Sequence, residues 1–171
     1  MNKAEEAYQL AFRYGVEYKN CSQAVLRAIY EVLNLKGAEL VIKSAHPLAG
    51  GLGLSGNCTC GALAGGVLAL GLVYGRSLEN MGKKGFLKSY VKAKELYDMF
   101  VNEFGGCSCK DVQLRLFGRS FNLWNPEDFR KFEEMGGHKD KCTEVSGKVA
   151  RWVVEIILAD EEAKKQLKIE E

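Results

Sequence analysis

The sequence predicts an all-α protein, a single compact domain built from about seven or eight helices around a central glycine-rich helix. Apolar residues recur every three or four positions along most of the chain, as they do on the buried face of a helix. No stretch shows a convincing alternation of period two, which a half-buried strand would need. Two prolines and 19 glycines indicate long helices separated by glycine-rich turns. We expect residues 1–171 to form one helical domain.

Three helices are predicted in the N-terminal third. Residues 3–18 carry apolar positions near one face, and 20–33 have a continuous apolar stripe. Asn20 is a suitable cap for the second of these helices. A short helix over 38–45 should end before Pro47, because the residue preceding a proline is pushed out of helical geometry.

Two helices are predicted in the middle of the chain, one apolar on every side and one with an aromatic stripe. Residues 60–74 are apolar on every side, as expected for a helix buried at the centre, and their glycines allow neighbouring backbones to approach closely. Between 86 and 104 aromatic residues recur at spacings of four and three, and we expect this stripe to pack in the core. The remaining predicted helices cover about 109–117, 126–134 and 141–158.

Composition excludes several classes of partner. The 24 Lys and Arg residues against 22 Asp and Glu leave a net charge of +2, so neither nucleic acid nor an acidic membrane is expected as a partner. The longest apolar stretch, 61–74, is shorter than the roughly 20 residues that a membrane-spanning helix needs. The chain opens directly into an amphipathic helix without the pattern of a signal peptide, so we expect a cytoplasmic location.

Cysteines are the most informative residues. In a reducing cytoplasm, six cysteines indicate thiols or metal ligands before a disulfide framework. Four of them, Cys21, Cys60, Cys109 and Cys142, stand in the first turns of four different predicted helices. The positive end of a helix dipole lowers a thiol's pKa, so we expect Cys21 and Cys109 to titrate below the ordinary value of ~8.5. Four such helix ends could converge on one site. The alternative is that each thiol is a small buried hydrophobe.

Each of these helices has a nearby candidate cap. Ser108, with Asp111 three residues later, forms a looser version of the capping box. The candidates are Asn20 for the helix of Cys21, Asn57 or Thr59 for that of Cys60, Ser108 for that of Cys109, and Asp140 for that of Cys142.

Three further residues are secondary candidates for the same site. Cys58 and Cys107 form C-x-C pairs with Cys60 and Cys109. Two residues along a helix turn by ~200°, so both members of a pair can face one site only if the first lies in the preceding loop. These two thiols are secondary metal ligands, resolving thiols or spectators. His138 is close in sequence to the last cysteine, so it is either a ligand or a surface loop residue.

The segment Gly51-x-Gly53-x-x-Gly56 matches a dinucleotide-binding pattern, but no strand precedes it and no βαβ unit surrounds it. We therefore expect no nucleotide cofactor, and interpret the segment as a flexible loop whose amides lie near whatever Cys60 holds. Hydrolase and phosphoryl-transfer motifs are absent from the sequence.

The order and context of the four cysteines resemble the family named for the pattern C_GCAxxG_C_C. Residues 20–25 look like its first cysteine element, and 59–65 are similar to its glycine-rich centre. Phe104-Gly105 with Cys109 resembles the third element, and Cys142 the last. The centre departs from the pattern, because it reads Thr-Cys-Gly-Ala where the family has Gly-Cys-Ala. The resemblance spans about residues 20–150 and implies involvement in redox chemistry.

We expect a redox or electron-transfer protein in which Cys21, Cys60, Cys109 and Cys142 bind an iron–sulfur cluster or another thiolate-ligated metal. We expect a redox partner protein, and the sequence leaves a homodimer open. One alternative is a metal-free thiol–disulfide oxidoreductase that uses the same cysteines as its redox-active groups, which leaves enzymatic activity open. Another is a non-redox helical scaffold with structural zinc or buried cysteines. Thiolates around one zinc ion would lie within roughly 4 Å of each other, while a cluster spreads them further.

Overall fold

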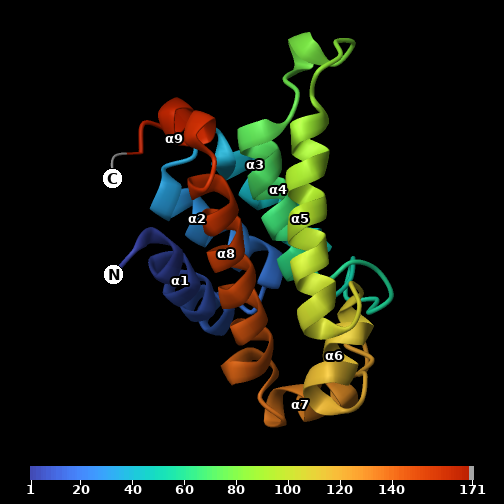
Figure 1. The fold of residues 1–171 in the computed structure, drawn as a ribbon. Coiled ribbons are helices and arrows are strands. Elements are labelled where there is room, and N and C mark those ends of the chain that lie inside the picture. The colour runs from blue at the N-terminus through green and yellow to red at the C-terminus, as the bar shows by residue number, and fades with distance from the viewer. Residues whose placement is uncertain (170–171) are drawn as a thin grey trace.

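The computed structural model describes residues 1–169 and confirms the all-α prediction (Figure 1). This part of the chain contains nine α-helices and no strand, with one isolated antiparallel β-bridge. The α-helices are α1 (Lys3–Tyr18), α2 (Cys21–Leu33), α3 (Ala38–Ala45), α4 (Gly61–Tyr74), α5 (Leu87–Phe104), α6 (Cys109–Phe117), α7 (Pro126–Glu134), α8 (Cys142–Leu158) and α9 (Glu161–Leu167). Two short 3₁₀ helices, η1 (His46–Leu48) and η2 (Leu78–Asn80), and a π-helical turn, η3 (Gly137–Lys141), complete the elements.

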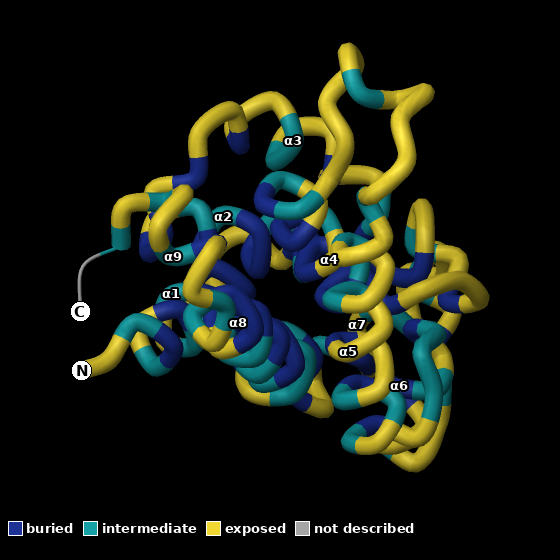
Figure 2. The backbone as a smooth tube through the Cα atoms, turned by 45° about the horizontal axis from the view of Figure 1, so that its top comes forward, coloured by how far each residue is buried: buried dark blue, intermediate teal, exposed yellow. Residues whose placement is uncertain are grey.

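Helices α2, α4 and α8 form the centre of the fold. Helix α1 packs along α8 and α2, while α5 covers α4 from the other side. The inner faces of these helices are buried, as Figure 2 shows. Glycine lets α4 approach its neighbours: a Cβ on Gly65 would lie 2.4 Å from the carbonyl oxygen of Ser22 in α2. The predicted central glycine-rich helix is therefore present, and its glycines serve close packing.

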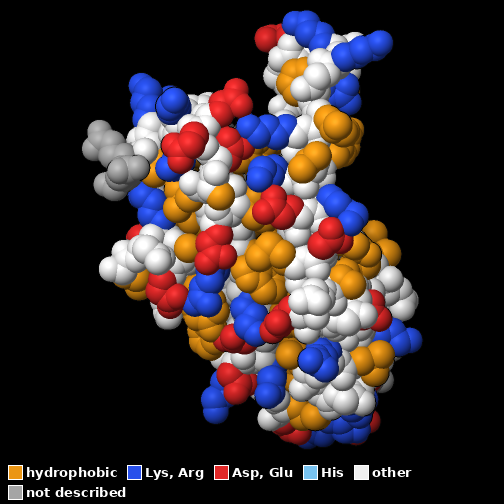
Figure 3. All heavy atoms as spheres, viewed as in Figure 1, with side chains coloured by type: hydrophobic (Ala, Val, Ile, Leu, Met, Phe, Trp, Pro, Cys, Tyr) orange, Lys and Arg blue, Asp and Glu red, His pale blue; other side chains and the backbone are white. Residues whose placement is uncertain are grey.

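The aromatic stripe of α5 is only half buried, which corrects the expectation that it packs in the core throughout. Phe100 and Phe104 are buried, but Tyr90 is 65% exposed and Tyr97 39% exposed. The N-terminal part of α5 and the connection over residues 75–86 extend beyond the helices that cover the rest of α5 (Figure 1). Figure 3 shows Lys and Arg side chains gathered at the tip of this projection.

The segment before α8 also differs from the sequence expectation. The chain enters α8 through the π-helical turn, and the amide of Cys142 donates to the carbonyl of Gly137. Cys142 therefore does not stand at a free helix N-terminus, and Asp140 does not cap α8. Helix α9, which we did not predict, is capped by the side chain of Asp160. Within residues 1–169, no helix combines the length and apolarity needed to cross a bilayer.

Candidate functional site

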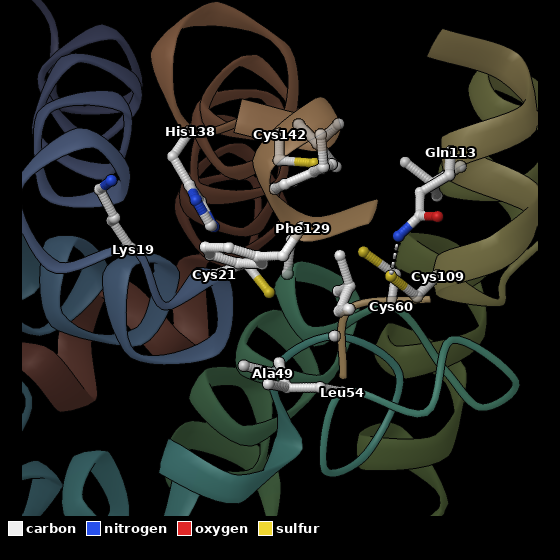
Figure 4. A pocket seen from close by; sticks show the side chains of 16 residues that line it. Lys19, Cys21, Ala49, Leu54, Cys60, Cys109, Gln113, Phe129, His138 and Cys142 are labelled. Carbon is white, nitrogen blue, oxygen red and sulfur yellow. Dashed lines mark hydrogen bonds between the residues drawn. The ribbon is translucent and has the colours of Figure 1, made fainter. Parts of the chain in front are cut away.

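One end of the fold contains a cavity of about 210 Å³ where the beginnings of α2, α4, α6 and α8 meet. Its wall includes Cys21, Cys60, Cys109 and Cys142, whose side chains are drawn in Figure 4. The other lining residues are mostly apolar: Ala49, Leu54, Ala62, Val112, Leu123, Phe129, Phe132 and Val145. The structure thus brings together the four cysteines singled out in the sequence, in a site with largely water-excluding walls.

The position of Cys21 depends on the cap of its helix and on the glycine at position 61, which leaves room for its sulfur. Asn20 accepts a hydrogen bond from the amide of Gln23 at 3.0 Å, and its amide group donates to the carbonyl of His46 at 3.1 Å. The Cys21 sulfur fills the space beside Gly61, where a Cβ would lie only 2.4 Å from that sulfur. Gly61 in α4 is therefore required for the position of Cys21 in α2.

The two C-x-C segments pair with each other, an arrangement that sequence analysis missed. Thr59 and Ser108 form the antiparallel bridge. The amide of Cys60 donates to the carbonyl of Cys107 at 2.8 Å, and the amide of Cys109 donates to the carbonyl of Cys58 at 3.0 Å. We call residues 58–60 and 107–109 the C-x-C bridge. It sets the second cysteine of each pair on the cavity wall and leaves the first cysteine off it.

The glycine-rich loop supports the C-x-C bridge. The amide of Gly56 donates to the carbonyl of Gly50 at 2.9 Å, and the amide of Lys110 in α6 donates to the carbonyl of Gly56 at 2.8 Å. Gly51 has a φ of 75°, which favours glycine, and a Cβ there would lie 2.9 Å from the Cβ of Cys109. The loop therefore holds the bridge in place, and several of its amides donate hydrogen bonds to backbone carbonyls of the protein itself.

Caps form at two of the four helices as predicted. Ser108 and Asp111 make a reciprocal capping box at the start of α6, and Asn20 caps α2. Neither Asn57 nor Thr59 caps α4; Cys60 itself occupies the N-cap position, with no side-chain hydrogen bond.

Burial raises the pKa of all four cavity thiols, which makes the expected low values for Cys21 and Cys109 wrong. The pKa of Cys109 rises to about 12. Helix-end amides do act in the predicted direction: those of Cys21, Ser22 and Ala62 lower the pKa of Cys21, but burial outweighs them. For Cys60 and Cys142, burial is again the main cause, and the charge of the neighbouring cysteines raises the pKa further. Removal from water thus decides the protonation of these thiols.

Gln113 is a polar residue at the cavity that sequence analysis did not identify. Its Nε2 lies 3.4 Å from the Cys109 sulfur, and its Oε1 accepts from the amide of Phe121 at 2.7 Å. The side chain is 1% exposed. Its place four residues after Cys109, on the same face of α6, is the signal that could have identified it.

A second polar group lies at the cavity between α1 and the η3 turn. Lys19 and His138 both line the cavity, and both contact the carboxylate of Glu133. The distance from Lys19 Nζ to Glu133 Oε2 is 2.9 Å. Burial acts to raise the pKa of Glu133, but its two basic partners outweigh this and lower the pKa. His138, a secondary candidate, is thus held beside the four cysteines through a carboxylate.

The cysteines are not arranged around a single ion. Among residues 1–169, no group of three or more His, Cys, Asp or Glu side chains has the geometry to hold one metal ion. The close spacing expected for four thiolates on zinc is therefore absent. All six cysteines are free thiols.

A family model described as "Putative redox-active protein (C_GCAxxG_C_C)" matches residues 19–156. The chain belongs to this family. The matched region contains all four cavity cysteines and the C-x-C bridge. No curated protein and no solved structure was found to match the chain.

Proposed function

We propose that this protein transfers electrons through a cofactor held by Cys21, Cys60, Cys109 and Cys142, and that this cofactor is an iron–sulfur cluster. The observation that carries the proposal is the shared cavity: four thiols from the beginnings of four helices line one small, mostly apolar space. Membership of a family described as redox-active supports a redox role. Thiolates from Cys are the usual ligands of iron–sulfur clusters.

The thiol and amide donors at the cavity suit a sulfur-ligated group. A cluster spreads its sulfur ligands further apart than a single zinc ion does, and the four cysteines line one cavity of about 210 Å³. Backbone amides from Gly50 and Ala62 are directed at the Cys21 sulfur, and that of Ala62 also acts on Cys60. Amide donors to cysteine sulfur stabilise negative charge and adjust the reduction potential of such sites.

The chain's own residues have separable tasks in this function. The four cysteines would lose their protons on binding, which the buried cavity disfavours until a cation is present. Gln113 donates to the Cys109 sulfur, and the apolar walls keep water away. An iron–sulfur cluster, when bound, supplies a one-electron couple. Lys19 contributes a positive charge at the rim, held in place by Glu133.

A metal-free thiol–disulfide oxidoreductase remains the second candidate. It is favoured by six free thiols and by the absence, within residues 1–169, of a preformed single-ion site. In this function only an attacking and a resolving cysteine are essential.

The test is anaerobic purification and reconstitution, read by iron and sulfide content and by visible absorbance. We expect stoichiometric iron and sulfide in the wild type. Serine variants of Cys21, Cys60, Cys109 and Cys142 should each lose most of the iron, because a four-ligand site loses its closed coordination whichever ligand is removed. Cys58→Ser and Cys107→Ser are the matched controls and should retain it. Stoichiometric zinc without sulfide would contradict the proposal. A wild type that takes up no metal yet forms one reversible disulfide would replace it with the second candidate.

A further inference from the structure

The projection formed by residues 75–91 concentrates exposed apolar side chains and positive charge. Leu78 is 85% exposed, Met81 63% and Leu87 69%, and Tyr90 is exposed as well. The same segment holds four Lys and Arg residues and one acidic residue, a net charge of +3 in a protein whose total is +2, so the rest of the chain is slightly acidic. The expectation of no acidic membrane partner rested on the total charge, which hides this uneven distribution.

The tip of the projection is a closed turn that stands clear of the rest of the protein. Arg76 donates from Nη1 to the carbonyl of Met81 at 2.8 Å and to that of Lys83 at 3.4 Å. Nothing lies within 4 Å of a Cβ placed on Gly82 or Gly85, so no other part of the described chain packs against the turn there. The chain thus holds the turn in a position where its apolar side chains face solvent. Exposure of this kind is unfavourable and marks a surface that binds something.

Lys83 and Lys84 supply charge that the protein itself does not neutralise. At the base of the projection, Lys88 lies 2.7 Å from Asp160 and 2.9 Å from Glu162, which ties α5 to α9. Among the residues that the structure describes, neither Lys83 nor Lys84 makes a salt bridge, and both are exposed. Figure 3 shows Lys and Arg side chains at the extreme end of the projection, next to hydrophobic ones. Their long stems let the ammonium groups reach a charged surface while the stems lie along an apolar one.

We propose that the projection binds an anionic lipid surface, with Leu78 and Met81 entering the boundary of the acyl chains and Lys83 and Lys84 contacting the headgroups. Exposed apolar side chains next to unpaired cations are the combination that holds a segment at a lipid interface. Tyr90, further along α5, is of the type that lies at headgroup level. A bilayer deforms around a convex tip, whereas a protein partner needs a hollow of matching shape. The shape and charge of the tip therefore favour lipid over an acidic protein.

Binding through the projection leaves the cysteine cavity free. Helix α5 starts in the projection and ends at Phe104, five residues before Cys109. Its 18 residues span about 27 Å. The projection and the α6–α7 end of the fold lie at opposite ends of the molecule (Figure 1). The lipid-bound protein thus keeps its cavity away from the lipid and accessible to a partner in solution, whether or not the cavity holds a metal.

The experiment sediments the full-length protein with sucrose-loaded vesicles made of equal parts phosphatidylcholine and phosphatidylglycerol, and with vesicles of phosphatidylcholine alone. We expect binding to the anionic vesicles only, and weaker binding as the ionic strength is raised. The double variant Lys83→Gln/Lys84→Gln should bind about 30-fold more weakly, because each lysine near an anionic surface contributes a factor of about five. Leu78→Ser/Met81→Ser should weaken binding at least about tenfold, through loss of apolar contact. All four side chains are exposed, so these replacements disturb no packing.

The matched control is Lys131→Gln/Lys139→Gln, which removes the same charge from exposed positions in α7 and η3, at the other end of the molecule. It should bind within about twofold of the wild type, because these lysines lie beyond the reach of screened charges at the lipid surface. Equal losses in the two lysine variants would mean that total charge decides binding, and would overturn the proposal. So would binding unaffected by Leu78→Ser/Met81→Ser, or no binding to anionic vesicles at all. Capture by polyglutamate beads but not by vesicles would replace lipid with an acidic protein surface.

Discussion

Gln113 connects the cavity to the loop that follows α6: its amide nitrogen lies 3.4 Å from the Cys109 sulfur while its oxygen accepts from the amide of Phe121 at 2.7 Å. The side chain is fully enclosed, so no water can replace either contact. One residue therefore sets both the surroundings of a cavity thiol and the course of the chain beyond it.

Replacing Gln113 with Leu should destabilise the protein by about 1–3 kcal/mol, because the buried amide of Phe121 loses its acceptor. Urea denaturation followed by circular dichroism measures the change. The matched control is Gln9→Leu, the same substitution on the exposed surface of α1, for which a change within about 0.5 kcal/mol is expected. Equal effects of the two substitutions would show that the buried contacts of Gln113 contribute nothing specific.

Gly61 and Gly71 provide a contrast within one helix. Gly61→Ala should destabilise the fold by about 1–3 kcal/mol, because the new Cβ would overlap the Cys21 sulfur and lie 2.9 Å from the Cα of Ala49. Gly71 has no atom within 4 Å of the corresponding position, so Gly71→Ala should stabilise α4 by about 0.5–1 kcal/mol through helix propensity. Thermal unfolding of both variants gives the comparison. A stable Gly61→Ala protein with unchanged thiol reactivity would contradict the packing described for Cys21.

Asp111 should make the stability of the α6 N-terminus depend on pH. Its hydrogen bonds with the side chain and the amide of Ser108 lower the pKa of the carboxyl below its usual value. Because the folded-state pKa is the lower one, the stabilisation is present above the unfolded value of about 3.9 and is lost as pH falls through the folded-state pKa.

Asp111→Asn should therefore reduce stability by about 0.3–1 kcal/mol between pH 5 and pH 8, through loss of the charge at a helix N-terminus. The difference between variant and wild type should shrink as the pH falls below the unfolded value of about 3.9, and it should vanish once the pH lies below the lowered folded-state pKa, where the wild-type carboxyl is also neutral. Urea titrations at several pH values measure it. A difference that stays constant down to pH 2 would show that the charge of Asp111 is not involved.

The cavity thiols should be protected from alkylation in the metal-free folded protein. Burial raises the pKa of Cys109 to about 12, so at pH 8 its thiolate is scarce and its modification should be at least about a hundredfold slower than that of an unperturbed thiol. Exposed Cys58 should react first. Iodoacetamide labelling read by peptide mass spectrometry gives all six rates, with urea-unfolded protein as the reference. Fast labelling of Cys109 in the folded protein would mean that the cavity is open to solvent.

The helices were predictable because local patterns determine them. Helical spacing of apolar residues gave α1, α2 and α4 to within about one residue, and the caps at Asn20 and Ser108 form as expected. Helix α9 was not anticipated, because seven residues show too little periodicity to be recognised.

The features that the sequence could not supply depend on tertiary contacts. The C-x-C bridge pairs segments far apart in the chain, so no local pattern marks it. The sign of the pKa shift at Cys21 depends on the balance between helix amides and burial, and burial is known only once the cavity is closed. The π-helical turn before Cys142 likewise arises where α8 meets its surroundings, and it removes the free helix end that spacing alone suggested.

The C-x-C bridge has a consequence for the order of folding. It joins the loop before α4 to the loop before α6, and the cavity it borders also needs α2 and α8, which come from opposite ends of the chain. Contacts between distant segments carry a loop-closure cost that is recovered only when most of the structure has formed. The four thiols can therefore gather only after the helices have docked, so a nascent or partly unfolded chain presents its cysteines separately and completes the cavity as one of the last steps of folding.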